Sequence, residues 1–186
     1  AVVGAGAAGY FAAIQLAEHF PEVQVKLYEK STPLAKVKVS GGGRCNVTHA
    51  CFDPKELIAF YPRGGRELLG PFHHFQPGDM MEWLERRGVD LKIEEDGRVF
   101  PVSNQSQSII DCFVGSLPEG VMIQQGVKDL IPLMDGQWEV VTQDNACDQF
   151  DAVLVTTGSS ELVWKMLVGL GVAVIDRVPS LFTFNI

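Results

Sequence analysis

The stretch Ala1-Val2-Val3-Gly4-Ala5-Gly6-Ala7-Ala8-Gly9 decides the fold, because it joins a short apolar strand to the glycine pattern G-x-G-x-x-G. Apolar residues then recur every four positions, which predicts a helix that ends before Pro21. A second strand is expected over Val23–Tyr28, and Glu29 follows it, 20 residues after the third glycine. Strand, glycine turn, helix, strand and acid together make a dinucleotide-binding βαβ unit of the Rossmann type.

Each residue type in this unit suits a particular part of dinucleotide binding. Gly4 permits a tight turn, Gly6 lets the backbone approach a pyrophosphate, and Gly9 lets the helix pack closely on the strand. The helix N-terminus offers unpaired N–H groups to phosphates, and Glu29 can accept hydrogen bonds from the adenosine ribose while disfavouring a 2′-phosphate. A structural glycine turn beside an unrelated surface Glu is the open alternative. The residues expected to hold the ADP half of a cofactor are Gly4, Gly6, Ala7, Ala8, Gly9 and Glu29.

A second glycine-rich stretch covers residues 39–48 and reads Val-Ser-Gly-Gly-Gly-Arg-Cys-Asn-Val-Thr. Three consecutive glycines are costly in backbone entropy, and a plain linker needs no Arg, Cys and Asn directly after them. We therefore expect a loop whose N–H groups approach a flat or anionic ligand, with Arg44 supplying positive charge. The residues expected toward this ligand are Lys36, Ser40, Gly42, Gly43, Arg44, Cys45, Asn46 and Thr48, and the resemblance described below implies that they face the pyrophosphate and flavin ring of FAD.

Local sequence patterns predict β-structure in two further segments. Residues 151–158 form an apolar run that ends in Thr-Thr-Gly, which predicts a buried parallel strand whose carboxyl end passes a ligand. Leu91–Ile93 and Arg98–Phe100 flank an Asp-Gly pair, which predicts a β-hairpin.

The glycine-rich stretch resembles the S-G-G-G-R-C-N-x-T segment of BaiN/YhiN-type (aminoacetone-oxidase-like) flavoproteins, and residues 94–101 resemble that family's E-x-x-G-R-V-F-P segment. Residues 151–158 resemble the D-x-hydrophobic-A-T-G strand of two-dinucleotide-fold flavoproteins, and Val178–Leu181 resembles the family's linker into an inserted domain. The chain departs from the pattern at His49, where Asn is common, and after Ser160, where a Gly/Ser-rich stretch with a Pro is usual.

The resemblance implies an FAD-binding domain and adds three residues to the expected cofactor site. By analogy, Val127 would offer backbone contacts to adenine, and Thr157 and Gly158 would pass close to the pyrophosphate. It also implies that the chain is the N-terminal, truncated portion of a longer protein.

The predicted fold class is α/β, a Rossmann-like FAD-binding domain with a βαβ opening, a parallel sheet and a β-meander. We expect helices over Asp53–Tyr61, Asp79–Arg87 and Asn104–Leu117, and meander strands over Val121–Gln125, Val127–Met134 and Gln137–Thr142. The whole chain, 1–186, is expected to be one domain with four parts: the βαβ unit and glycine loop over 1–49, helices and hairpin over 50–120, meander and return strand over 121–160, and a helix and linker over 161–186.

Composition narrows the function classes. Hydrophobic residues make up 46% of the chain and charged residues 20%, as in ordinary globular proteins. The net charge of −8 argues against a nucleic-acid partner and against docking on an anionic membrane. Apolar runs stop well short of a membrane span, and the four cysteines form no C-x-x-C pair, so no metal site is predicted. Without a recognisable secretory leader, a cytoplasmic protein with free thiols is expected.

These patterns predict an FAD-dependent oxidoreductase that passes electrons between a small-molecule donor, or NAD(P)H, and a second acceptor. The sequence assigns no catalytic acid or base and no oligomeric state, and a small-molecule substrate is expected. Two alternatives remain open: an NAD-dependent dehydrogenase built on the same opening unit, and a non-catalytic dinucleotide-binding fragment. A visible flavin spectrum would support the FAD-dependent oxidoreductase, and a colourless protein that binds NAD would support the dehydrogenase.

Overall fold

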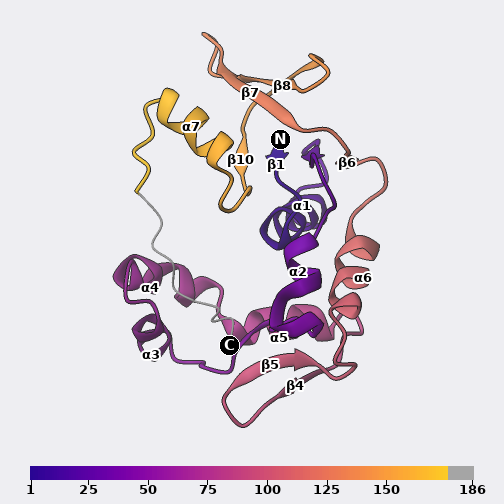
Figure 1. Ribbon diagram of the computed structural model, residues 1–186, viewed down its shortest axis with the longest axis vertical. Helices are drawn as coiled ribbons and strands as arrows, with labels where there is room; N and C mark the ends of the chain where they lie inside the picture. Colours follow the sequence, from indigo (N-terminus) through magenta and orange to yellow (C-terminus); the bar gives the residue numbers. More distant parts are fainter. Residues whose placement is uncertain (176–186) are drawn as a thin grey trace, which may run out of the picture.

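The computed structural model describes residues 1–175, and a four-stranded parallel sheet lies at its centre (Figure 1). The strand order is β10-β1-β2-β6. All four strands are short: β1 (Val2–Val3), β2 (Leu27–Tyr28), β6 (Met122–Ile123) and β10 (Leu154–Val155). Val3 pairs with Tyr28 on one side and Val155 on the other, so the carboxyl ends of three strands meet at one edge. The predicted Rossmann-type sheet is confirmed.

Helix α1 (Ala7–His19) follows β1 directly, as the glycine pattern and the apolar spacing predict. It buries Tyr10, Ala13 and Ile14 in a core that it shares with Trp83 and Phe113. The second strand is shorter than the predicted Val23–Tyr28, because the chain leaves α1 through turns and enters the sheet only at Leu27.

Six further helices complete the fold of residues 1–175. Their bounds are α2 (Ala35–Val39), α3 (Pro54–Leu57), α4 (Gly65–His74), α5 (Pro77–Glu85), α6 (Ser106–Ser116) and α7 (Glu161–Gly169), with 3-10 turns η1 (Ser40–Gly43) and η2 (Ile58–Phe60). The predicted helix over Asp53–Tyr61 divides into α3 and η2, and Asp53 caps it by accepting the Lys55 N–H at 2.7 Å. Helix α4 was not predicted, because its glycines and internal Pro71 obscure the pattern.

Two antiparallel sheets flank the parallel one. The first has the order β3-β5-β4 and contains the predicted hairpin: β3 (Thr48–His49), β4 (Leu91–Ile93) and β5 (Arg98–Pro101). The second is a meander of β7 (Val127–Pro132), β8 (Trp138–Thr142) and β9 (Cys147–Phe150). In Figure 1 the meander and the hairpin lie at opposite ends of the molecule, with α1 and α2 between them.

The predicted composition of the meander is wrong in one strand. Residues 121–125 were expected to open it, but β6 instead pairs in parallel with β2, Met122 opposite Leu27. The third meander strand is β9, whose Cys147 and Gln149 are exposed and give no apolar signal. The predicted return strand is confirmed as β10, which pairs with β1.

The meander is tied to the parallel sheet by Asp148. The Tyr28 hydroxyl donates to Asp148 at 2.7 Å, and Lys26 Nζ lies 3.0 Å from the same carboxylate. Burial, together with this hydrogen bond, raises the pKa of Tyr28 well above its ordinary value. Within residues 1–175 no helix is long and apolar enough to cross a membrane. The predicted linker, Val178–Leu181, lies outside the described residues.

Candidate functional site

A cleft of about 680 Å³ opens at the carboxyl ends of β1, β2 and β10, within the size range of small-molecule and cofactor sites. Its walls come from seven regions of the chain: the turn before α1, the segment after β2, the glycine loop, α5, α6, the start of β7 and the segment from β10 into α7. This is the edge of an open parallel sheet where ligands bind in α/β folds.

The first glycine turn forms the floor of the cleft. Gly4 has φ of +104°, and a Cβ there would come within 2.8 Å of the Thr157 Cα. A Cβ on Gly9 would lie 1.9 Å from the Gly4 carbonyl oxygen, so only glycine lets α1 approach the strand this closely. A Cβ on Gly6 would meet nothing within 4 Å, because Gly6 faces the open cleft. The three glycines therefore occupy the environments that a dinucleotide turn requires.

The electrostatics of the α1 N-terminus favour the binding of an anion. Its N-cap is Gly6, which has no side chain to satisfy the first N–H groups, and its first turn contains no acidic residue. Ala7 and Ala8 line the cleft beside it. The unsatisfied N–H groups and the positive end of the helix dipole favour a negatively charged group here.

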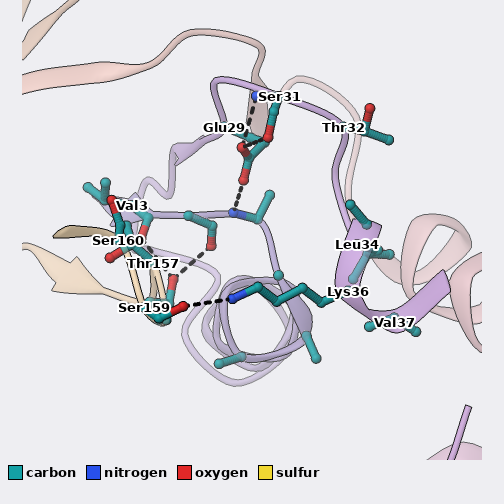
Figure 2. A pocket seen from close by; sticks show the side chains of 18 of the residues that line it. Val3, Glu29, Ser31, Thr32, Leu34, Lys36, Val37, Thr157, Ser159 and Ser160 are labelled. Carbon is teal, nitrogen blue, oxygen red and sulfur yellow. Dashed lines mark hydrogen bonds between the residues drawn. The ribbon is translucent and has the colours of Figure 1, made fainter. Parts of the chain in front are cut away.

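Glu29 stands at the end of β2 with its carboxylate fixed by the surrounding backbone (Figure 2). One oxygen accepts the Ala5 N–H at 2.9 Å, and the other accepts the N–H and hydroxyl of Ser31 at 2.9 and 2.8 Å. The Gln124 amide donates to the carbonyl oxygens of Glu29 and Ser31 at 3.0 and 2.7 Å. Burial works to raise the pKa of Glu29, but the hydrogen bonds from Ser31 and Ala5 outweigh it and hold the pKa below its ordinary value.

Lys36 bridges two walls of the cleft. Figure 2 shows its side chain reaching from α2 across the end of α1, where Nζ donates to the Ser159 hydroxyl at 3.2 Å. One positive charge thus lies beside the α1 N-terminus. On the same wall, the Thr156 hydroxyl donates to the Gly4 carbonyl at 2.7 Å and lies 3.0 Å from the Val3 carbonyl, which joins β10 to the glycine turn.

Most of the predicted site residues are brought together. Those that line the cleft are Gly4, Gly6, Ala7, Ala8, Glu29, Lys36, Ser40, Cys45, Asn46, Val127, Thr157 and Gly158. Those that do not line it are Gly9, Gly42, Gly43, Arg44 and Thr48. Gly9 lies behind the turn, as its packing role demands, and Thr48 pairs with Val99 between β3 and β5. A cofactor contact by Gly42, Gly43, Arg44 or Thr48 stays a prediction.

Sequence reasoning missed the polar residues that organise the cleft, Ser31, Thr156 and Ser159, and most of its apolar wall. Ser31 follows an acid at the end of a strand, a position typical of a side-chain-stabilised turn, so a local signal existed. The apolar wall includes Met80 of α5 and Ile109 and Phe113 of α6. The sequence placed these side chains only within predicted helices, because nothing local shows that those helices border a cleft.

Cys45 lines the cleft as a buried thiol and is free, like the other three cysteines. Burial raises its pKa, although a hydrogen bond with Ser40 acts in the opposite direction. The thiol is therefore protonated at neutral pH, which does not favour a nucleophilic role. Among residues 1–175 no group of three His, Cys, Asp or Glu is placed to hold a metal ion.

Comparisons with solved structures agree with the fold. Glycine oxidase from Geobacillus kaustophilus superposes with a TM-score of 0.53 at 13% identity, over 92% of this chain and 58% of the oxidase. At this identity the likeness concerns the fold alone.

Sequence comparisons identify relatives and a family. The 3-dehydro-bile acid delta(4,6)-reductase of Clostridium scindens is 26% identical over 159 residues, which is 84% of this chain and 38% of the reductase. The ribosomal RNA dihydrouridine synthase of Escherichia coli is 27% identical over 119 residues, 64% of this chain and 28% of the synthase. The chain thus spans well under half the length of these relatives. Residues 1–175 match the family described as HI0933-like protein Rossmann domain. The chain therefore belongs to this family, in agreement with its resemblance to BaiN/YhiN-type flavoproteins.

Proposed function

We propose that the chain is the FAD-binding part of an FAD-dependent oxidoreductase. The observation that carries the proposal is the convergence of the open backbone at Gly6, the uncapped α1 N-terminus and the Glu29 carboxylate on one cleft. An ADP group carries the matching chemistry, an anionic pyrophosphate and a ribose with two hydroxyl donors. When bound, FAD supplies the redox chemistry, and the protein contributes orientation and electrostatics.

The cleft residues divide by chemistry. Gly6, Ala7 and Ala8 offer N–H groups to the pyrophosphate, and Lys36 adds a positive charge beside them. Glu29 Oε1 already accepts two hydrogen bonds from Ser31, but Oε2 accepts only the Ala5 N–H, so Oε2 retains capacity for a ribose hydroxyl. The remaining assignments, made by resemblance or by position in the glycine loop, are Val127 toward adenine and Ser40, Cys45, Asn46, Thr157 and Gly158 along the rest of the cofactor.

The reaction class follows from the names of two relatives. One is called a delta(4,6)-reductase and the other a dihydrouridine synthase, and both names denote addition of hydrogen to a carbon–carbon double bond. We infer the same class for the protein to which this chain belongs. NAD(P)H is oxidised to NAD(P)⁺, and the double bond of a small organic molecule gains one hydride and one proton.

A second candidate substrate is a base in RNA, because the Escherichia coli relative is named for ribosomal RNA. The net charge of −8 works against a polyanionic partner, so a small molecule is the favoured substrate. We place the protein in the cytoplasm on the basis of its four free cysteines, which suit a reducing compartment.

The test begins with the cofactor of the purified chain. Heat-released cofactor is identified by chromatography and quantified by its visible absorption, and stoichiometric FAD is expected. A colourless protein that binds NAD would instead support the dehydrogenase alternative. The longer protein is then assayed for NAD(P)H oxidation with conjugated enones and, separately, for dihydrouridine formation in ribosomal RNA. Turnover of RNA alone would replace the small-molecule proposal. FAD binding without any turnover would support a non-catalytic fragment.

A further inference from the structure

Arg44 is the one charged residue of the second glycine-rich stretch, and its guanidinium is engaged outside the cleft. Nη1 lies 2.6 Å from Glu94 Oε1, and Nη2 lies 3.5 Å from Glu94 Oε2. The guanidinium carbon lies 3.8 Å from the centre of the Phe100 ring, at stacking distance. Arg44 thus joins the glycine loop to the β4–β5 hairpin across 50 residues of sequence.

Residues that line the cleft stand close to Arg44 in sequence. Ser40 begins η1, four residues before Arg44, and Cys45 and Asn46 follow Arg44 directly. A displacement of Arg44 would therefore be felt at this part of the cleft wall.

Packing holds the loop at its two ends, Gly41 and Cys45, and not between them. Cys45 is buried in the main core, and its N–H donates to the Ser40 carbonyl at 3.0 Å. A Cβ on Gly41 would come within 2.7 Å of the Asn46 nitrogen and 3.0 Å of the fully buried Phe100 ring, so Gly41 lies tightly against the hairpin. A Cβ on Gly42 or Gly43 would meet nothing within 4 Å, and both residues have positive φ. The outer half of the loop has no comparable packing, and the contacts of the Arg44 side chain with Glu94 and Phe100 lie where that half ends.

Glu94 has other cationic neighbours. Arg98 Nη2 lies 3.6 Å and Lys92 Nζ 4.0 Å from its carboxylate. If Arg44 is replaced, Glu94 still has two positively charged neighbours. The replacement is therefore expected to loosen the glycine loop rather than the hairpin.

We propose that Arg44 is a positioning residue, which fixes the wall formed by Ser40, Cys45 and Asn46 through its bridge to Glu94 and Phe100 and does not itself contact the cofactor. The inference rests on the proposed function, since it takes the cleft to be the cofactor site. It replaces the role that the sequence suggested, a positive charge presented to the flavin.

The first test is a double-mutant cycle on FAD affinity, measured by fluorescence titration. Glu94→Gln is expected to weaken FAD binding roughly two- to five-fold, the scale of a partly exposed ion pair. The double variant Arg44→Gln/Glu94→Gln should lose no more than Arg44→Gln alone, because both changes break one bridge. Glu82→Gln is the matched control, since it removes another carboxylate paired with an arginine, Arg86 on the exposed side of α5. Unchanged affinity in Glu94→Gln, or additive losses in the double variant, would overturn the proposal.

The second test does not depend on FAD. In a background with Cys51, Cys112 and Cys147 replaced by Ala, the rate at which a thiol reagent labels Cys45 reports how firmly the wall is held. Cys45 is 6% exposed, so labelling of the parent is expected to be slow. Labelling should be several-fold faster in Arg44→Gln and Glu94→Gln, unchanged in Glu82→Gln, and close to the parent rate in Arg44→Lys, which keeps the charge.

The two tests distinguish a failure of the proposed function from a failure of the proposed role of Arg44. A parent protein that binds no FAD removes the proposed function, while the labelling rates still report on the bridge. Equal labelling rates in all folded variants, with folding checked by circular dichroism, would show that Arg44 does not position the wall.

Discussion

The chain contains two glycine-rich turns that look alike in sequence, Gly4–Gly9 and Gly41–Gly43, yet different forces hold them. In the first turn, Gly4 and Gly9 are required by direct contact between backbones, with a Cβ on Gly9 only 1.9 Å from a carbonyl oxygen. In the second turn, Gly42 and Gly43 are required by positive φ, and nothing lies within 4 Å of a Cβ. The first turn is fixed by backbone packing at Gly4 and Gly9. The second is packed only at Gly41 and is otherwise held by conformation and, as we propose, by the Arg44 bridge.

This difference shows that glycine content alone does not reveal what a turn does. A packed glycine turn cannot change shape without disturbing the sheet beneath it, so it presents a rigid floor to a ligand. A turn held mainly at its ends can move if one tether is lost. The substitutions below probe the contrast between the two turns, in order of decreasing expected effect.

Gly9→Ala is expected to have the largest effect on stability. Its methyl group would overlap the Gly4 carbonyl oxygen, so α1 must move away from β1, at a cost of about 3 kcal/mol or more in the free energy of unfolding. Urea unfolding followed by circular dichroism measures this cost. A loss below about 1 kcal/mol would mean that the turn is not fixed by packing.

Gly6→Val is expected to abolish FAD binding while preserving the fold. Gly6 has extended backbone angles, φ of −81° and ψ of −171°, and space for a side chain, so the free energy of unfolding should change by no more than about 0.5 kcal/mol. The added isopropyl group would occupy the cleft where the pyrophosphate approaches. Equilibrium dialysis with FAD checks the first statement and urea unfolding the second. Stoichiometric FAD in the folded variant would contradict the assignment of this turn.

Glu29→Ala tests the acid that is hydrogen-bonded to the first turn through the Ala5 N–H. Loss of charge-assisted hydrogen bonds to the ribose should weaken FAD binding by about 1–3 kcal/mol. Isothermal titration calorimetry of the cofactor-free protein measures the change. Glu95→Ala on the exposed hairpin turn is a control that should leave the affinity as it is. Equal affinities in the two variants would remove Glu29 from the ribose site.

Gly42→Ala should cost only about 1 kcal/mol, the penalty for placing a Cβ at positive φ, because no atom lies in its way. Comparison with Gly9→Ala in the same urea series separates conformational cost from steric cost. A loss of stability as large as that of Gly9→Ala would mean that Gly42, like Gly41, is closely packed.

The smallest expected effect is a pH dependence. The pKa of Glu29 is held below its ordinary value of 4.5, so its ionised form stabilises the folded chain above that pH, and the contribution is lost as the pH falls through the folded-state pKa. The difference in unfolding free energy between wild type and Glu29→Gln should therefore shrink below pH 4.5. Urea titrations at a series of acidic pH values check the direction. A difference that grows on acidification would contradict it.

The sequence by itself determined the βαβ opening, the hairpin, the return strand and the family. The structural elements depend on rules that operate over a few neighbouring residues, such as glycine at a turn, apolar spacing in α1, and an Asp-Gly pair between two strands. The family follows from the resemblance of short motifs. Twelve of the 17 predicted site residues line one cleft. Those that follow β1, β2 and β10 do so because the parallel topology brings the carboxyl ends of these strands to one edge.

Only the tertiary structure decided which strands pair and where the charged side chains lie. Met122 and Ile123 are as apolar as a meander strand would be, and their place beside β2 depends on the packing of the whole sheet. The sequence predicted a flavin contact for Arg44 but gave no sign of the partner that its side chain has in the structure, Glu94, which is 50 residues away. A long side chain such as that of arginine can reach several partners. Which partners lie within its reach is decided by the tertiary fold, so sequence spacing does not predict the one it contacts.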